Sequence, residues 1–351
     1  MYDKKVLIIG AGPAGLSSAI ELAKQNIDSV IIEKSLFPGG HGIDLACKAA
    51  EKCVKCGACI VEEKIREASK NPGIKIISGA RAKIISNPDD PGSDGFAAII
   101  EKEAEESECS VSADAVILAT GFRPFDPENK PYGYKKFQNV ITSLELEKMI
   151  REKGMAQTRS DGKAPDSIAF IQCVGSRDSS LGHLWCSKVC CGSALRMACL
   201  AKTDRPETEI VFFYIDIQNF GKDFIRYHEK IKNEIELIRS IPGDIFETQD
   251  NKLSVGYFDK ATESPCEKIF DMVVLSVGIT PENPEILQTL AKRPENSKSF
   301  ISTAEQNEMA KRGVFVAGTA KGPMNIEESV ADGGFAALNA IKYMEKKTCH
   351  E

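Results

Sequence analysis

The sequence predicts an α/β protein with parallel sheets that are covered on both faces. The first observation is a set of short apolar runs without polar alternation, beginning with Val6–Ile9, which are typical of strands buried on both sides. The second is a glycine-rich segment between that run and an apolar helical stretch, because parallel strands are joined through helices. The third is a weaker copy of this pattern in the middle of the chain, which indicates a second unit of similar architecture.

The composition is that of a globular protein with more than one domain. The 351 residues are 42% hydrophobic and 27% charged, so the chain can bury a large core. The net charge is −6 and no basic stripe follows the sequence, so nucleic-acid binding is not expected. No apolar run reaches the roughly 18–20 residues that span a bilayer, and Met1–Lys5 leads into a strand rather than a signal peptide. We therefore expect a cytoplasmic protein without a membrane span.

A glycine motif follows the first apolar run and precedes a helix from Leu16 to about Gln25. A second apolar run then ends in an acidic residue. In a dinucleotide-binding unit, the first glycine permits a tight turn, the second lets the backbone approach a pyrophosphate, and the third lets the helix pack on the strand. The helix start offers N–H groups to the anion, and the acid accepts the ribose hydroxyls. The expected binding residues are Gly10, Gly12, Pro13, Ala14, Gly15, Glu33 and Lys34.

Two further segments favour FAD over NAD as the dinucleotide. Gly39 and Gly40 follow the acidic residue closely, as in flavoproteins with two dinucleotide-binding domains. The run Ala115–Gly121 reads as a strand that ends in an Ala-Thr-Gly turn. It resembles the strand that leads out of the FAD domain in the thioredoxin-reductase and glutathione-reductase group. We therefore also expect FAD contacts from Ala119, Thr120 and Gly121.

The C-terminal region resembles the same group. Gly313–Gly318 reads as a buried strand, and a helix follows from about Asn325 to Lys346. In that group the helix points its N-terminus at the flavin and stabilises negative charge on the reduced ring. Thr319 stands where the group has an aspartate. The contacts expected here are Gly318, Thr319 and Ile326.

These segments predict a thioredoxin-reductase-like flavoprotein fold with two dinucleotide-binding domains. The FAD-binding domain is discontinuous, with residues 1–135 and 285–351, and residues 136–284 form a degenerate NAD(P)-binding-like domain. The strands expected in that domain are Ser167–Gln172, Glu209–Tyr214 and Asp271–Val277, and the helices are Val189–Ala201 and Gly221–Lys232. After its first strand only Gly175 remains of a glycine motif, so the backbone cannot approach a pyrophosphate and NAD(P)H binding is not expected.

Twelve cysteines are many for a protein expected in a reducing compartment, where clustered cysteines indicate metal, cluster or redox chemistry. Four of them are isolated in sequence, and we expect no role for these: Cys109, Cys199, Cys266 and Cys349. A first group has the spacing C-x12-C-x3-C-C: Cys173, Cys186, Cys190 and Cys191. Four thiolates at a strand end and a helix start can hold a 4Fe-4S cluster, provided that a turn splays the two adjacent side chains. Unrelated buried and free thiols are the alternative.

A second group has the spacing C-x2-C-x2-C, which opens a ferredoxin-type cluster motif. It consists of Cys53, Cys56 and Cys59, and Glu63 stands where the fourth cysteine of that motif would be. Cys47 is the nearest candidate for a fourth ligand. A second cluster is the first interpretation of this group. A share in one cluster with the other group, a labile site, structural zinc and a redox-active thiol pair are the alternatives.

Several strings resemble the HdrA component of heterodisulfide reductase, over residues 4 to about 340. The most specific are Gln172–Asp178 with Cys186–Cys191, and Leu275–Pro281 and Ile326–Ala331 are also similar. The resemblance implies FAD on a thioredoxin-reductase-like fold, with a cluster held by Cys173, Cys186, Cys190 and Cys191. Methanogen members are longer and carry further domains. This chain looks more like the short subunits of sulfur-oxidising heterodisulfide-reductase-like complexes, or of the quinone-interacting oxidoreductase.

We therefore predict an electron-transfer subunit with FAD and one or two 4Fe-4S clusters. It would pass electrons between flavin, cluster and the other subunits of a heterodisulfide-reductase-like complex in sulfur or disulfide metabolism. A homodimer is expected, because related flavoproteins are often dimers. The alternative is a stand-alone NAD(P)H-dependent disulfide reductase in which Cys53 and Cys56 form the reactive pair. A non-enzymatic flavin-binding module would leave eight clustered cysteines without a role.

Overall fold

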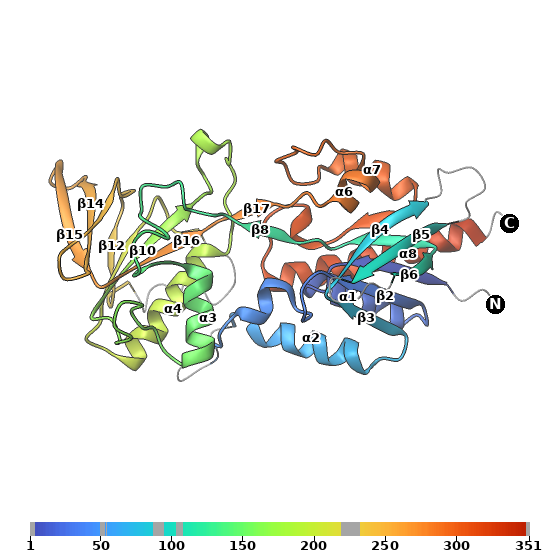
Figure 1. Ribbon diagram of the computed structural model, residues 1–351, viewed down its shortest axis with the longest axis horizontal. Coiled ribbons are helices and arrows are strands. Elements are labelled where there is room, and N and C mark those ends of the chain that lie inside the picture. The colour runs from blue at the N-terminus through green and yellow to red at the C-terminus, as the bar shows by residue number, and fades with distance from the viewer. Residues whose placement is uncertain are drawn as a thin grey trace. The chain divides into compact units, whose positions relative to one another are not determined.

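The computed structural model describes residues 4–49, 53, 55–86, 95–102, 108–218 and 232–348. The chain divides into two compact units (Figure 1). The first consists of Met1–Ile43, Gly57–Arg123 and Pro281–Glu351, and the second of Asp44–Cys56 and Pro124–Thr280. In the part of the chain that is described, no helix combines the length and the apolar character needed to cross a membrane.

The first unit is built on a five-stranded parallel sheet. Across the sheet, its strands are β18 (Val314–Val316), β7 (Ala115–Leu118), β1 (Lys5–Ile9), β2 (Asp28–Glu33) and β3 (Ile74–Ser78). Val6 and Ile8 pack into the core on one face of the sheet, and Leu7 packs into the core on the other. Burial on both faces is the reason that the first strand is continuously apolar.

Helices cover one face of this sheet, and a mixed layer covers the other. The helices of the first face are α1 (Pro13–Ala23), α2 (Ala58–Lys70) and α8 (Ile326–Thr348). The other face holds the antiparallel strands β4 (Ala80–Ser86), β5 (Phe96–Lys102) and β6 (Glu108–Ala113), with the helices α6 (Glu285–Ala291) and α7 (Thr303–Lys311). In Figure 1 the antiparallel strands lie together in the same unit as the labelled parallel strands β2 and β3.

The second unit repeats the architecture with a parallel sheet of its own. Across this sheet, the strands are β12 (Glu236–Ile238), β11 (Glu209–Phe213), β10 (Ser167–Val174), β16 (Met272–Val277) and β9 (Val140–Thr142). One face packs on α3 (Ser143–Lys153) and α4 (Cys190–Asp204). The other packs on the antiparallel strands β13 (Ile245–Glu247), β14 (Leu253–Asp259) and β15 (Ser264–Phe270). Two parallel sheets with covered faces confirm the α/β prediction.

Short elements complete the description. Strands β8 (Phe122–Pro124) and β17 (Ile279–Pro281) form a two-stranded sheet, and the 3₁₀ helices are η1 (Gly40–Asp44), η2 (Ser179–Leu181) and η3 (Gly318–Ala320). The three strands and the first helix expected in the middle of the chain are present as β10, β11, β16 and α4. The expected helix Gly221–Lys232 lies almost wholly outside the described residues.

The unit boundaries differ from the sequence-based ones at three segments. Residues 44–56 and 124–135 were expected with the first unit but belong to the second, and residues 281–284 were expected with the second unit but belong to the first. The reason is packing, because Ala46 and Tyr132 are buried in the two cores of the second unit. Burial of this kind joins segments that are distant in the sequence, so it leaves no local signal.

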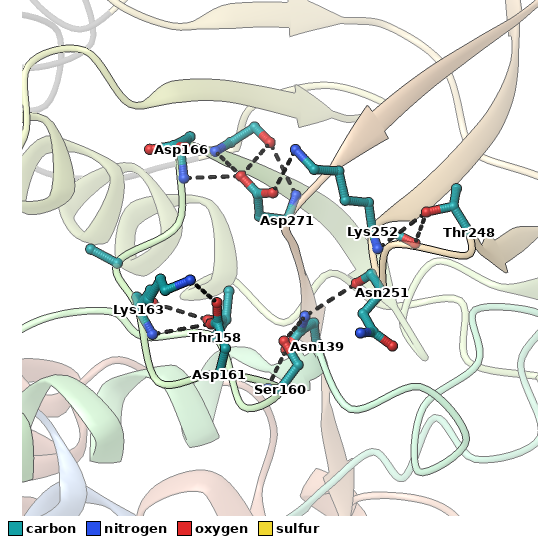
Figure 2. Close-up of polar contacts among 12 residues, drawn as sticks. Asn139, Thr158, Ser160, Asp161, Lys163, Asp166, Thr248, Asn251, Lys252 and Asp271 are labelled. Carbon is teal, nitrogen blue, oxygen red and sulfur yellow. Dashed lines mark hydrogen bonds and ion pairs between the residues drawn. The ribbon is translucent and has the colours of Figure 1, made fainter.

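Hydrogen bonds to backbone amides hold the amino-terminal edge of the second sheet (Figure 2). Asp271, just before β16, accepts from the backbone amides of Asp166 (3.0 Å) and Ser167 (2.9 Å). Its other oxygen pairs with Lys252 at 3.0 Å. Burial raises the pKa of Asp271, but the hydrogen bonds from Lys252 and Ser167 outweigh it and hold the pKa below the ordinary value. The carboxylate therefore stays charged and joins the starts of β10 and β16.

The side chain of Asn139 holds the segment before β10 through hydrogen bonds to its backbone amides (Figure 2). Its side chain is buried, and its Oδ1 accepts from the backbone amides of Arg159 (2.9 Å) and Ser160 (3.1 Å). Its Nδ2 donates to the Ser160 hydroxyl at 2.9 Å. One amide side chain therefore fixes a turn of the connection that the sequence marks only as polar.

We expect Asn139→Ala to lower the free energy of unfolding by about 2 kcal/mol, because two backbone amides lose their acceptor. Urea denaturation measures the change. The control is Ser160→Ala, which removes only the hydroxyl that receives the Asn139 amide and should lose about 1 kcal/mol or less. Equal stability of Asn139→Ala and the wild-type chain would contradict this role.

Candidate functional site

The glycine turn between β1 and α1 is tightly packed at two of its three glycines. Gly10 has a φ of +104°, and a Cβ there would lie 2.3 Å from the carbonyl oxygen of Ala119. A Cβ on Gly15 would lie 1.9 Å from the carbonyl oxygen of Gly10. Both positions exclude a side chain for reasons of protein packing alone. At Gly12, in contrast, a Cβ would meet no heavy atom within 4 Å, so this residue faces open space.

The start of α1 is suited to an anion. Gly12 is the N-cap and its helix has no side-chain cap, while Pro13 occupies the first turn. The amides of an uncapped first turn and the positive end of the helix dipole attract negative groups. The space above Gly12 is therefore bordered by unsatisfied donors, as a pyrophosphate would require.

Glu33 lies where the sequence predicted the ribose-binding acid, at the end of β2. It is buried, and its oxygens accept from the amides of Ala11 (2.7 Å) and Ser35 (2.8 Å). A carboxylate has about four acceptor sites, so these bonds position the group and leave others for hydroxyl donors. The neighbouring Lys34 is largely exposed and pairs with Glu282 at 2.7 Å.

The loop after Glu33 returns to the glycine turn. The amide of Gly39 donates to the carbonyl of Ala11 at 2.8 Å. Gly40 has a φ of +56°, and a Cβ on it would lie 3.3 Å from the Cα of Gly12. The loop that the sequence assigned to the dinucleotide thus lies against the turn assigned to its pyrophosphate.

The strand end at Ala119–Gly121 contributes an unused polar atom. The amide of Ala119 donates to the carbonyl of Ile9 at 2.8 Å, which places this strand end beside β1. The hydroxyl of Thr120 is buried, and no hydrogen-bond partner for it is present in the described part of the chain. Gly121 follows with a φ of +78°. A buried hydroxyl without a partner is costly, so a ligand group fits this position.

Gly318 and Thr319 lie in η3, ahead of α8. Gly318 has a φ of +70°, and a Cβ there would lie 2.8 Å from the Cβ of Ala14. Its amide donates to Asp332 at 2.7 Å, and Asp332 also pairs with Lys321 at 2.9 Å. Sequence reasoning missed Asp332, because an acid inside a helix has no distinguishing neighbour pattern. Thr319 is buried.

The start of α8 is capped, unlike that of α1. The side chain of Asn325 accepts from the amide of Glu328 (2.7 Å), and the side chain of Glu328 accepts from the amide of Asn325 (3.0 Å). Ile326, the first residue of α8, lies 3.2 Å from the position of a Cβ on Gly57.

The open space at Gly12, the buried Glu33 and the Thr120 hydroxyl together fit an FAD whose pyrophosphate lies above Gly12 and near Thr120.

The first cysteine group lies at a bent strand end in the second unit. The pairing of β10 with β16 is irregular between Ile171 and Val174, and Cys173 has a φ of +61°. In the loop that follows, Arg177 and Lys188 also have positive φ values, of +55° and +64°. A positive φ is uncommon for residues other than glycine and costs about 1–2 kcal/mol each. The backbone is therefore bent at this loop in a way that directs particular side chains.

Cys190 and Cys191 begin α4, and their side chains contact different groups. The Cys190 thiol lies 3.6 Å from the carbonyl oxygen of Val277, and the Cys191 thiol lies 4.0 Å from that of Asp216. The start of α4 thus directs the side chains of Cys190 and Cys191 apart, which is needed if both are to bind one cluster.

The four thiols of this group lie close enough to affect one another. Burial, together with the charges of Cys173 and Cys186, raises the pKa of Cys191 to about 11. Burial, followed by the charges of the other three cysteines, also raises the pKa of Cys190. The loop and the helix start therefore bring together the four residues that the sequence grouped by spacing.

Four cysteine thiolates are the donor set that a 4Fe-4S cluster takes. Within the described residues, no three His, Cys, Asp or Glu side chains come together as a metal ion would require. A cluster at Cys173, Cys186, Cys190 and Cys191 therefore stays a prediction.

The residues of the second cysteine group are divided between the two units. Cys47, Cys53 and Cys56 belong to the second unit, whereas Cys59 lies on α2 in the first. Cys47, Cys53 and Cys59 are exposed, and Cys56 is half-buried. The Cys53 thiol accepts from the amide of Lys55 at 3.4 Å. Which ligand this group takes stays a prediction.

Of the isolated cysteines, Cys349 lies outside the described residues.

Known proteins share both this fold and the N-terminal sequence pattern. Residues 4–169 match the family model of pyridine nucleotide-disulphide oxidoreductases, and the match ends before Cys173. The thioredoxin reductase of Lactococcus lactis superimposes with a TM-score of 0.62 at 19% identity, covering 98% of this chain and 99% of that one. The thioredoxin reductase of T. acidophilum gives a TM-score of 0.64 at 18% identity with the same coverage. The thioredoxin-reductase-like fold is confirmed.

Curated relatives extend the similarity to nearly the whole chain. The HdrA component of the H(2):CoB-CoM heterodisulfide,ferredoxin reductase of Methanothermobacter marburgensis is 29% identical over 98% of this chain. An HdrA-type iron-sulfur subunit of the CoB--CoM heterodisulfide reductase of Methanopyrus kandleri is 30% identical over 96%. The chain is homologous to HdrA of heterodisulfide reductase. It spans 64% of the length of each of these two relatives. The predicted resemblance is confirmed, and so is the class of flavin-dependent oxidoreductase.

A buried ion pair positions the Cys47 segment of this chain. Lys48 and Glu147 pair at 2.6 Å, with side chains only 3% and 1% exposed. Glu147, on α3, also accepts from the amide of Ala46 (3.1 Å) and from the hydroxyl of Ser193 (2.6 Å). Ser193 lies on α4, one turn after Cys190. One carboxylate therefore joins the segment that carries Cys47 to the helix that begins with Cys190 and Cys191.

Sequence reasoning missed this carboxylate for a simple reason. Glu147 belongs to the stretch Ser143–Lys153, in which acidic and basic residues alternate with apolar ones. Such a pattern is typical of the solvent-exposed face of an amphipathic helix. Only the tertiary contacts with Lys48 and Ser193 distinguish Glu147 from its neighbours.

We expect Glu147→Gln to lower the free energy of unfolding by about 3 kcal/mol, because it leaves the Lys48 ammonium buried without its counter-charge. The double variant Lys48→Met with Glu147→Gln should lose less, since no unpaired charge remains. Urea denaturation of the three proteins measures the difference. A double variant less stable than Glu147→Gln would show that the ion pair is not the stabilising contact.

Proposed function

We propose that the chain is an electron-transfer subunit that carries FAD and at least one 4Fe-4S cluster. The observation that carries the proposal is the gathering of Cys173, Cys186, Cys190 and Cys191 at the end of β10 and the start of α4. In a thioredoxin-reductase-like domain this strand–helix connection is where the glycine motif for NAD(P)H is expected. Thiols in place of glycines favour electron exchange through a cluster over hydride exchange with a nicotinamide.

In the proposed FAD site, the residues of the first unit bind and orient the cofactor. Gly12 and the amides at the start of α1 hold the pyrophosphate, and Glu33 accepts the ribose hydroxyls. The remaining contacts come from the loops around the turn and from the start of α8: Pro13, Ala14, Gly39, Gly40, Ala119, Thr120, Gly121, Gly318, Thr319 and Ile326. FAD exchanges electrons in pairs and an iron–sulfur cluster exchanges them singly, so together they convert between the two.

The relatives support the proposed partners. Their names describe subunits of reductases that act on the CoB-CoM heterodisulfide, which supports a role within a multisubunit complex of sulfur or disulfide metabolism. The naming of one relative as an iron-sulfur subunit supports the cluster. We also infer a cytoplasmic location, a homodimer, and a second cluster at Cys47, Cys53, Cys56 and Cys59.

Anaerobic quantitation of iron, sulfide and flavin in one sample tests the proposal. We expect a brown protein with iron and sulfide in equal amounts and about one flavin per chain. Cys190→Ser should lose at least half of the iron bound at the first group. Cys199→Ser, which changes a cysteine on the same helix outside the group, should keep the wild-type content. A yellow, iron-free protein that NADPH reduces rapidly would instead favour the stand-alone disulfide reductase.

Two glycine variants separate flavin binding from folding. Gly12→Ala places its Cβ in open space, so we expect a folded protein whose FAD affinity falls about tenfold or more, about 1.4 kcal/mol. Gly15→Ala forces a Cβ against the Gly10 carbonyl and should destabilise the unit itself. Flavin content and thermal unfolding of the flavin-free proteins measure the two effects. Full flavin content in Gly12→Ala would contradict the assigned pyrophosphate position.

A further inference from the structure

Arg177 lies in the loop of the first cysteine group and pairs with a carboxylate. Its guanidinium forms a two-pronged ion pair with Asp216, through Nη1 to Oδ1 and through Nη2 to Oδ2 at 3.1 Å. Its charge also lies near enough to Cys173 to oppose the rise that burial causes in the pKa of that thiol. The Arg177 backbone is in the left-handed region, with a φ of +55°. The bent loop therefore holds a permanent positive charge near a candidate cluster ligand.

Asp216 extends the contact to a second cysteine. Its backbone carbonyl lies 4.0 Å from the Cys191 thiol, and its Oδ2 accepts from the side-chain amide of Gln218 at 3.1 Å. Both of its carboxylate oxygens accept from the Arg177 guanidinium. A positive and a negative group thus lie together beside Cys173 and Cys191, with side chains 25% and 37% exposed.

The two charges have opposite effects on a neighbouring redox centre. One electron taken up by a thiolate-bound cluster adds one negative charge to it, and no bond to a protein residue is formed or broken. A nearby guanidinium stabilises that added charge, whereas a carboxylate at similar distance destabilises it. Local charges and hydrogen bonds to the sulfurs are among the factors that set cluster potentials.

We propose that Arg177 raises the reduction potential of the cluster at Cys173, Cys186, Cys190 and Cys191, and that Asp216 limits this effect by pairing with it. The inference rests on the proposed function, since it needs the cluster. It makes Arg177 and Asp216 positioning residues whose role is electrostatic. Neither residue is a cluster ligand.

The test is a reductive titration of the full chain with dithionite, followed by electron paramagnetic resonance of the reduced cluster. Arg177→Gln should lower the potential by about 59 mV, which is a tenfold change in the one-electron equilibrium constant. Arg177→Lys should fall between Arg177→Gln and wild type, because lysine keeps the charge without the two-pronged geometry. Asp216→Asn should shift the potential upward. If Arg177 and Asp216 were merely structural, the two variants Arg177→Gln and Asp216→Asn would not shift the potential in opposite directions.

The control is Lys130→Gln. Lys130 pairs with Asp178 in the same loop, and its loss should change the potential less than Arg177→Gln. Should Arg177→Gln fail to retain iron, Arg177→Lys and Asp216→Asn decide the question. Unchanged potentials, or shifts of the same sign in Arg177→Gln and Asp216→Asn, overturn the inference in a protein that holds its cluster. Wild-type protein without iron overturns the proposed function instead, and this inference with it; iron quantitation before titration separates the two.

Discussion

The close approach of Gly15 to the carbonyl oxygen of Gly10 is the contact on which the first unit depends. A side chain at either glycine would collide with the backbone, so the helix α1 can lie against β1 only because both are absent. This packing places the uncapped start of α1 at the carboxyl edge of the sheet, where open-sheet proteins bind ligands. The open space above Gly12 lies at this edge. So does Thr120, whose buried hydroxyl has no hydrogen-bond partner among the residues that the structure describes.

The second unit uses the same strand–helix position with different chemistry. Its first central strand, β10, also ends beneath a helix, but a long loop replaces the short glycine turn. Positive φ values at Cys173, Arg177 and Lys188 bend this loop. Buried contacts around the loop offset the unfavourable free energy of these backbone conformations. Ser187, for example, is buried and accepts from the amide of Ile279 at 2.8 Å. A backbone held in this way can direct thiols from a strand end and a helix start toward one another.

The sequence predicted the elements of the site better than the contacts that support them. The strands around the glycine turn, the position of Glu33 and the grouping of four cysteines were all readable from order and spacing. Glu147 and the pairing of Arg177 with Asp216 were not, because each joins segments far apart in the chain. The assignment of residues 44–56 to the second unit was missed for the same reason: it depends on the burial of Ala46 and Lys48. Asp332 was missed because an acid inside a helix has no distinguishing neighbour pattern.

Local sequence patterns were enough to predict the fold class, the glycine turn and the grouping of the cysteines by spacing. These features are local, since buried strands need unbroken apolar runs, tight turns need glycine and metal clusters need thiolates. Which charges lie near the cysteines, and which carboxylate joins their segments, can be seen only in the folded chain. Such contacts depend on how distant surfaces meet, and a charged residue has the same local pattern whether it is solvated on a helix or buried in an ion pair.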